Sequence, residues 1–201
     1  MTDKHSNKFR LLIYIFCFFS ILQISSCTTI KNSRAAIDIN QRIAVLPFTN
    51  MTETPQADER VGSIVTDILY TRGFCNIVGY PINRFKPSLI PGVKKPIPRK
   101  NLIKWARKQG AQYALIGSVT EWNYKVGLDG EPAVGVNMEL INLSSGRVVW
   151  TSVGSRIGYS RMAVSQVGIE LIDKMIRSVA ARWFYPVQNS KCNQGCKVRP
   201  H

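Results

Sequence analysis

The sequence predicts an α/β (α+β) fold, in which helices pack on a mixed β-sheet. Three consecutive strand-like runs, 113–124, 133–143 and 147–159, carry most of this prediction. Apolar and polar residues alternate along the middle run, as in a strand with two different faces, and glycine-containing turns join the runs into an antiparallel meander. A strand-helix-strand pattern precedes the meander and an amphipathic helix follows it. The expected element order is therefore β-α-β-α-β-β-β-α.

The predicted domain opens with the strand-helix-strand unit. Residues 43–48 (IAVLPF) form a nearly continuous apolar run, which is typical of a buried central strand. A helix is expected to begin at Thr54 and Pro55, because threonine is a common N-cap and proline suits the first helical position. Gly73 is expected to end this helix, and 74–78 is predicted as a second strand, parallel to the first.

A proline-rich and basic segment follows, over 81–108. Its prolines predict a surface loop over 81–98, and a short helix is expected to end at Gly110. No Asp or Glu occurs from Ile68 through Thr120. Basic residues of this segment are candidates for contact with a membrane or a partner protein, the alternative being a solvated face. These candidates are Lys94, Lys95, Arg99 and Lys100.

The first 26 residues are predicted to be a lipoprotein signal peptide. A positively charged start is followed by an apolar stretch over 11–24, which is too short to span a bilayer comfortably. The sequence Ile-Ser-Ser-Cys that ends at Cys27 resembles the bacterial lipobox, in which cleavage precedes the cysteine and lipid is attached to its thiol. The alternative is an ordinary signal peptide with Cys27 as a bystander.

Acylation of Cys27 would anchor the chain stably, because two or three acyl chains give stable membrane binding, whereas a single chain binds only weakly and reversibly. By resemblance to lipoprotein sorting signals, the absence of Asp at Thr28 favours the periplasmic face of the outer membrane. Residues 27–41 are expected to be a polar tether between the lipid and the domain.

A single periplasmic domain is predicted over 42–186, closed by an amphipathic helix over 162–183. The tail, 187–201, is basic and contains Cys192 and Cys196. This pair could close a small disulfide loop in an oxidising compartment or remain as two free thiols. A metal site is not expected, because the cysteines lack zinc-site spacing and partners.

The net charge of +15 indicates attraction to an anionic surface, such as lipid headgroups, lipopolysaccharide, an acidic protein or nucleic acid. Nucleic acid is not expected, because the leader predicts export and the aromatic residues do not interleave with the charges. Neither an enzyme nor a cofactor is expected, because the domain has no histidine, no nucleophile beside a base and no phosphate-binding glycine motif.

Residues 42–183 resemble the periplasmic lipoprotein domains related to the curli secretion channel protein and the amino-terminal domain of TolB. Two runs are more specific than the rest of this resemblance: Glu-Trp-Asn-Tyr-Lys at 121–125 and Gly-Glu-Pro-Ala-Val-Gly at 130–135. These runs are most similar to the PelC-like outer-membrane lipoproteins of Pel exopolysaccharide export.

The resemblance implies a non-catalytic subunit that forms a homo-oligomeric ring and cooperates with an outer-membrane export porin and a secreted polysaccharide. It suggests Trp150 as a membrane-facing residue, with sheet packing as the alternative, and Arg147 as a contact to headgroups or a neighbouring subunit. Asp129 and Glu131 could face the polysaccharide or serve only the turn. The second hypothesis is a monomeric regulatory lipoprotein that binds and activates a periplasmic cell-wall synthase or envelope complex, and the short tether argues against it.

Overall fold

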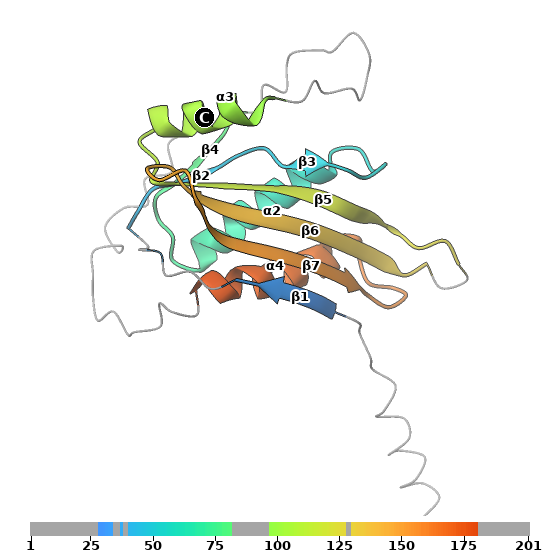
Figure 1. The fold of residues 1–201 in the computed structure, drawn as a ribbon. Helices are drawn as coiled ribbons and strands as arrows, with labels where there is room; N and C mark the ends of the chain where they lie inside the picture. The colour runs from blue at the N-terminus through green and yellow to red at the C-terminus, as the bar shows by residue number, and fades with distance from the viewer. Residues whose placement is uncertain (1–27, 34–36, 38–39, 82–96, 128–129, 181–201) are drawn as a thin grey trace, which may run out of the picture.

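The computed structural model describes residues 28–33, 37, 40–81, 97–127 and 130–180, which form a mixed sheet with helices on both faces (Figure 1). The strands are β1 (Thr28–Asn32), β2 (Ile43–Val45), β3 (Thr49–Asn50), β4 (Ile77–Gly79), β5 (Tyr113–Tyr124), β6 (Pro132–Asn142) and β7 (Val148–Ile157). The helices are α2 (Ala57–Thr71), α3 (Arg99–Lys108) and α4 (Val164–Ala180).

The sheet has the strand order β1-β7-β6-β5-β2-β4, and β3 pairs with β5. Strands β5, β6 and β7 form the predicted antiparallel meander. Strand β2 lies parallel to both β4 and β5, which confirms the β-α-β unit at the start of the domain. The predicted α/β fold is thus confirmed. The sheet has more strands than the sequence indicated, because β1 and β3 also join it.

The start of α2 differs from the expectation. The helix begins at Ala57, and Gln56 occupies the N-cap in the left-handed region with φ 60°. Thr54 does not cap it, because its hydroxyl donates instead to the backbone oxygen of Trp122 on β5. The predicted end is confirmed, since the helix stops at Thr71 and Gly73 has φ +87°.

The segment 27–41, expected to be a polar tether, contributes an edge strand to the sheet. Strand β1 pairs antiparallel with β7, and Thr28 lies opposite Arg156. The Ser152 hydroxyl donates to the side chain of Asn32, and Ile30 packs against the core under α4. The tether prediction is wrong for 28–32, because these residues pair with β7 and complete the edge of the sheet.

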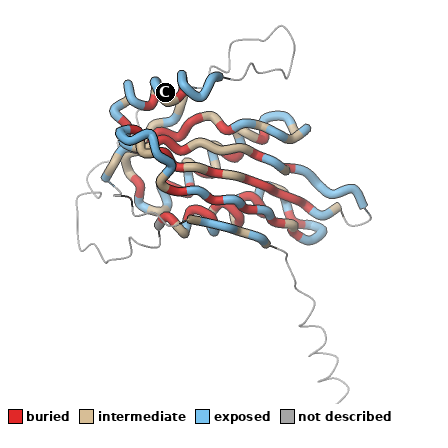
Figure 2. Tube along the Cα trace, in the orientation of Figure 1, coloured by how far each residue is buried: buried red, intermediate tan, exposed pale blue. Residues whose placement is uncertain are grey.

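The two faces of the sheet are covered unequally. Helices α2 and α4 pack on one face and enclose the larger hydrophobic core (Figures 1 and 2). Helix α3 packs on the opposite face, where a smaller cluster includes Ala44, Leu102 and Ala114. Among the described residues, no helix lies over that face of β6, β7 and β1. Nor is any helix in the described ranges both long and apolar enough to cross a membrane.

Candidate contact surfaces

The sheet has two ends, which organise the candidate residues. At one end, called here the proximal end, β1 begins, β7 ends and the β5–β6 hairpin turns, as the pairs Thr28–Arg156 and Tyr124–Pro132 establish. At the other, called the distal end, the β6–β7 turn lies beside α3. The ten residues of β7 run between them, a length of about 30 Å.

Trp150 is part of the hydrophobic core. Its side chain is 1% exposed, and its Nε1 donates to the Ser178 hydroxyl of α4 at 3.1 Å. The predicted membrane contact of Trp150 is therefore wrong, because the indole is covered by α4. Sheet packing, the alternative drawn from the sequence, is what the structure contains.

Arg147 is exposed in the β6–β7 turn at the distal end. The turn is closed by a backbone hydrogen bond from Asn142 to Arg147, at 2.9 Å. Arg147 is therefore about 30 Å from Thr28, the first described residue after Cys27.

The exposed side of α3 forms a basic surface. Its members are the exposed cations of that helix: Arg99, Lys100, Lys104, Arg107 and Lys108. Arg99 pairs with Glu139 of β6 at 3.0 Å, and Arg107 donates to the backbone oxygen of Leu143 at 3.2 Å. On the inner side of the helix, Trp105 makes an edge contact with Tyr80, with ring centroids 4.8 Å apart. The helix is thus fixed on the sheet, while its three lysines project from it without an acidic partner in the described part of the chain, an arrangement that can bind an anionic group.

The helix-free part of the sheet is a polar surface that the sequence did not single out. We call it the open face; it consists of Thr29, Lys31, Ser118, Glu121, Asn137, Glu139, Thr151, Val153 and Ser155, which alternate with core residues. Asn137 donates to the Ser118 hydroxyl at 3.4 Å, and Glu121 pairs with Lys125. Only the strand register brings these residues together, since they come from four strands. Small polar side chains and carboxylates make this surface suited to polar contacts.

Glu131 is exposed at the proximal end, just before β6. Its backbone oxygen accepts a hydrogen bond from the Lys125 amide at 2.7 Å. The structure therefore supports a turn role for its backbone and leaves its carboxylate accessible. Several predicted residues lie outside the described part of the chain: Cys27, Lys94, Lys95, Asp129, Cys192 and Cys196.

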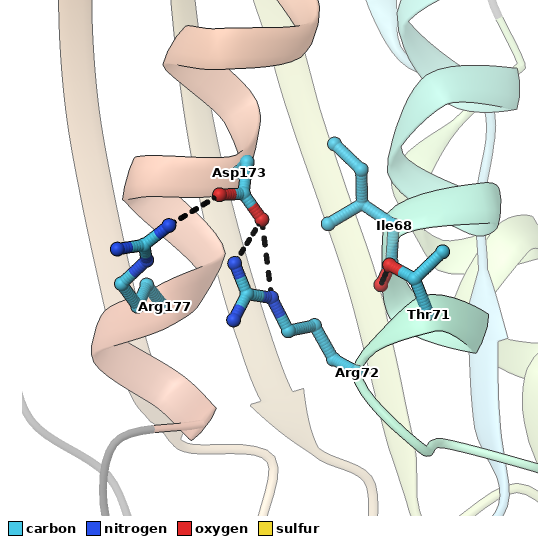
Figure 3. A network of polar contacts seen from close by, with 5 residues as sticks. All are labelled: Ile68, Thr71, Arg72, Asp173 and Arg177. Atoms are coloured by element: carbon cyan, nitrogen blue, oxygen red, sulfur yellow. Dashed lines mark hydrogen bonds and ion pairs between the residues drawn. The ribbon is translucent and has the colours of Figure 1, made fainter.

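An ion-pair network holds the two helices of the core face together (Figure 3). Asp173 of α4 accepts hydrogen bonds from Arg72, which follows α2, and from Arg177 one turn later, the latter at 2.8 Å. Burial raises the pKa of Asp173, but the hydrogen bonds and charges of the two arginines outweigh burial and lower that pKa below its ordinary value. Thr71 does not join the network; its hydroxyl donates to the Ile68 backbone oxygen. This network is structural.

A second ion pair joins α4 to the sheet at the proximal end. Arg156 of β7 contacts Glu170 of α4 at 2.6 Å, and the arginine side chain is 8% exposed. The described residues contain no group of three or more His, Cys, Asp or Glu side chains placed to hold a metal ion.

The chain is similar to solved structures of one protein in particular. The PelC dodecamer from Paraburkholderia phytofirmans is 35% identical over 76% of this chain and 96% of that one, with a TM-score of 0.65. A variant of the same dodecamer in another crystal form is also 35% identical over 77% and 99%, with a TM-score of 0.66.

More distant matches concern LpoB. The family model described as peptidoglycan-synthase activator LpoB matches residues 94–155. The LpoB C-terminal domain from Salmonella enterica is 19% identical over 60% of this chain and 86% of that one, with a TM-score of only 0.40. No curated protein matches the sequence.

Proposed function

The chain belongs to the PelC family, and on that premise we propose that it is a non-catalytic accessory subunit of an exopolysaccharide export complex of the Pel type. In this proposal the mature chain is anchored through an acylated Cys27 to the periplasmic face of the outer membrane. It assembles with copies of itself into a ring, beside an export porin, and contacts the secreted polysaccharide.

The observation that carries the proposal is the 35% identity to PelC over nearly the whole length of that protein. The relative is a dodecamer, which supports self-assembly of this chain. A ring requires two different surfaces on each copy, so that one copy can contact the next in a repeating manner. The open face and the outer surface of α2 and α4 lie on opposite sides of the sheet and meet this requirement.

The position of β1 supports the anchored state. Thr28 is already paired in the sheet, so an acylated Cys27 would be within about 4 Å of it along the chain. The domain would then be held directly at the membrane surface, with its proximal end toward the lipid. Arg147 and the basic surface of α3 would face away from the bilayer, which favours a protein or polymer partner for them.

Two experiments test the proposal. Deletion of the gene should abolish matrix polysaccharide outside the cell, and the wild-type gene should restore it, whereas a Cys27→Ser gene should not. Light scattering on the detergent-solubilised lipoprotein should give a mass several times that of the 22.6 kDa precursor chain. Normal secretion without the gene would refute the role in export, and a strict monomer would refute the assembly into a ring.

A second candidate function is activation of a cell-wall synthase, and the match of residues 94–155 to the LpoB model favours it. An activator of this kind has to reach from the outer membrane through the cell wall. Strand β1 leaves no linker between Cys27 and the sheet, so the reach of this chain is limited to the domain itself. We therefore place this function second; a binding assay with a purified periplasmic synthase separates the two.

A further inference from the structure

Three lysines of the basic surface form a stripe along α3, called here the lysine stripe. Lys100, Lys104 and Lys108 follow one another at intervals of four residues, which places them on one side of the helix about 6 Å apart. All three are exposed, and the first turn of the helix holds no acidic residue. Like charges at this spacing repel one another and destabilise a helix. An acidic group supplied from outside would relieve this repulsion.

An acid suited to the lysine stripe lies on the other side of the sheet. Asp67 is exposed on α2 and has no ion-pair partner in the described ranges. Figure 1 shows α2 and α3 on opposite faces of the sheet, so this carboxylate cannot reach the lysines of its own chain. Several other acids are already paired within the chain: Glu121, Glu139, Glu170 and Asp173.

Asp67 stands at the same level of the sheet as the lysine stripe. Helix α2 starts near Trp122, whose backbone oxygen accepts a hydrogen bond from Thr54, and it ends near the distal end, where β4 follows. Asp67 is four residues before the last residue of α2, or about 6 Å from that end. Helix α3 is held over the same distal part of the sheet, because Arg107 donates to the Leu143 backbone oxygen at 3.2 Å.

The lipid anchor of the proposed function determines which levels of neighbouring copies can meet. Each copy would be held through its own acylated Cys27, beside Thr28 at the proximal end. All copies of a ring would then stand at one height above the bilayer, with the rotation axis perpendicular to the membrane. Under this symmetry a side chain meets side chains at its own height on the next copy. Lys104 is therefore opposite the level of Asp67 and far from Glu131 at the proximal end.

We propose that the lysine stripe of one copy forms ion pairs with Asp67 of the next copy, with Lys104 at the centre of the contact. The inference rests on the proposed function and deepens it, since it names the surfaces through which the ring assembles. The two groups lie on opposite faces, which is the heterologous arrangement that a closed ring requires. The chain has 27 Lys and Arg against 12 Asp and Glu, so its copies repel one another unless acids and bases are matched where they meet.

The test reverses each charge separately and then both together, in the full lipidated protein solubilised in detergent. Lys104→Glu and Asp67→Lys each bring like charges together, and light scattering should show a mass well below that of the wild-type assembly. The double variant restores opposite charges in exchanged positions and should recover most of the wild-type mass. Arg147→Glu is the matched control, because it makes the same charge change at an exposed distal position on neither helix. Circular dichroism checks that every variant is folded.

A second measurement does not depend on charge. The thiols other than the acylated Cys27 are first replaced by serine, at Cys75, Cys192 and Cys196. Copies with Lys104→Cys are then assembled with copies that carry Asp67→Cys and treated with a short bismaleimide, which joins two nearby thiols. Cross-linked dimers should form in the mixture and in neither population alone. A chain that carries both substitutions should give a ladder of cross-linked multimers.

Three results would each overturn the proposal: assembly unchanged by both single reversals, no recovery of mass in the double variant, or no cross-link in the mixture. Disassembly by Arg147→Glu to the same extent as by Lys104→Glu would also overturn it, since net charge and not this contact would then control assembly. The wild type separates the two levels. A strict monomer removes the ring of the proposed function, whereas a wild-type ring without this cross-link removes only the contact between α3 and α2.

Discussion

Two glycines inside helices provide a sharp test of the packing between α4 and the sheet. A Cβ added at Gly168 of α4 would lie 2.6 Å from Cη2 and 2.7 Å from Cζ3 of Trp122. Trp122 is 1% exposed, and shifting a ring inside a closely packed core displaces its neighbours. A Cβ added at Gly62 of α2 would meet only the Phe48 ring, at 3.9 Å, which is an ordinary contact.

Both positions gain about 1 kcal/mol of helix propensity when glycine becomes alanine. Gly62→Ala should keep most of this gain and raise the free energy of unfolding by about 0.5–1 kcal/mol. At Gly168 the overpacking cost is about 1–3 kcal/mol and offsets or exceeds the gain; with a Cβ at 2.6 Å we expect the upper part of that range, so Gly168→Ala should lower the free energy of unfolding by up to about 2 kcal/mol. The same substitution thus has opposite signs at the two sites.

Urea denaturation of a soluble version that begins at Thr28, followed by circular dichroism, measures both changes through the transition midpoint. In a Trp122→Phe background the ring atoms that Gly168→Ala would meet are gone, and the penalty should shrink in a double-mutant cycle. A stabilising Gly168→Ala, or a penalty unchanged by Trp122→Phe, would refute the proposed packing of α4 on β5.

Other predictions follow from the core, the ion pairs and the anchor. Asp173→Asn should lower the free energy of unfolding at pH 7 by about 1 kcal/mol. Because folding lowers the pKa of Asp173, its contribution to stability is present above the unfolded pKa and is lost as pH falls below about 4. The free energies of unfolding of wild type and variant should therefore converge when denaturation is measured from pH 7 to pH 3. A constant difference between them would contradict the ion pair. Trp150→Ala should cost about 3–5 kcal/mol in the same assay, whereas Arg147→Ala should stay within about 0.5 kcal/mol; similar effects would argue against burial of the indole. Cys27→Ser should move the protein from the membrane fraction to the soluble periplasm without changing its circular dichroism, and retention at the membrane would exclude the anchor.

The central strands were predictable because their pattern is long and strictly local. The run Tyr113–Tyr124 was predicted with the bounds that β5 has, since glycine-containing segments bracket twelve residues of strand-forming sequence. The bulge within it was not predictable: pairing shifts between Val119 and Glu121, where Thr120 approaches Gly135 of the neighbouring strand. Such a shift depends on the partner strand and leaves no mark in the sequence of β5.

The local sequence pattern could not predict strand β1 or which segments meet at the two ends of the sheet. The run TTIKN contains a single apolar residue, Ile30, and its partner strand lies about 120 residues later. Local pattern therefore favoured a tether. Trp150 was misassigned as a membrane contact because a single tryptophan looks the same in a sequence whether its side chain is exposed or buried. Only the packing of α4 over β7 shows that this indole is buried.

The pairing of β1 with β7 bears on how the proposed lipoprotein would mature. In the proposed lipoprotein a peptidase would cleave ahead of Cys27 and would need an extended and accessible substrate, yet Thr28 is paired with Arg156 in the sheet. In that case the rest of the domain would fold while the leader is still attached, and β1 would take the edge position beside β7 after cleavage. Release from the translocation machinery would then double as the last folding step. An uncleaved precursor should accordingly exchange the amide hydrogens of 28–32 rapidly, and slow exchange there would contradict this order of events.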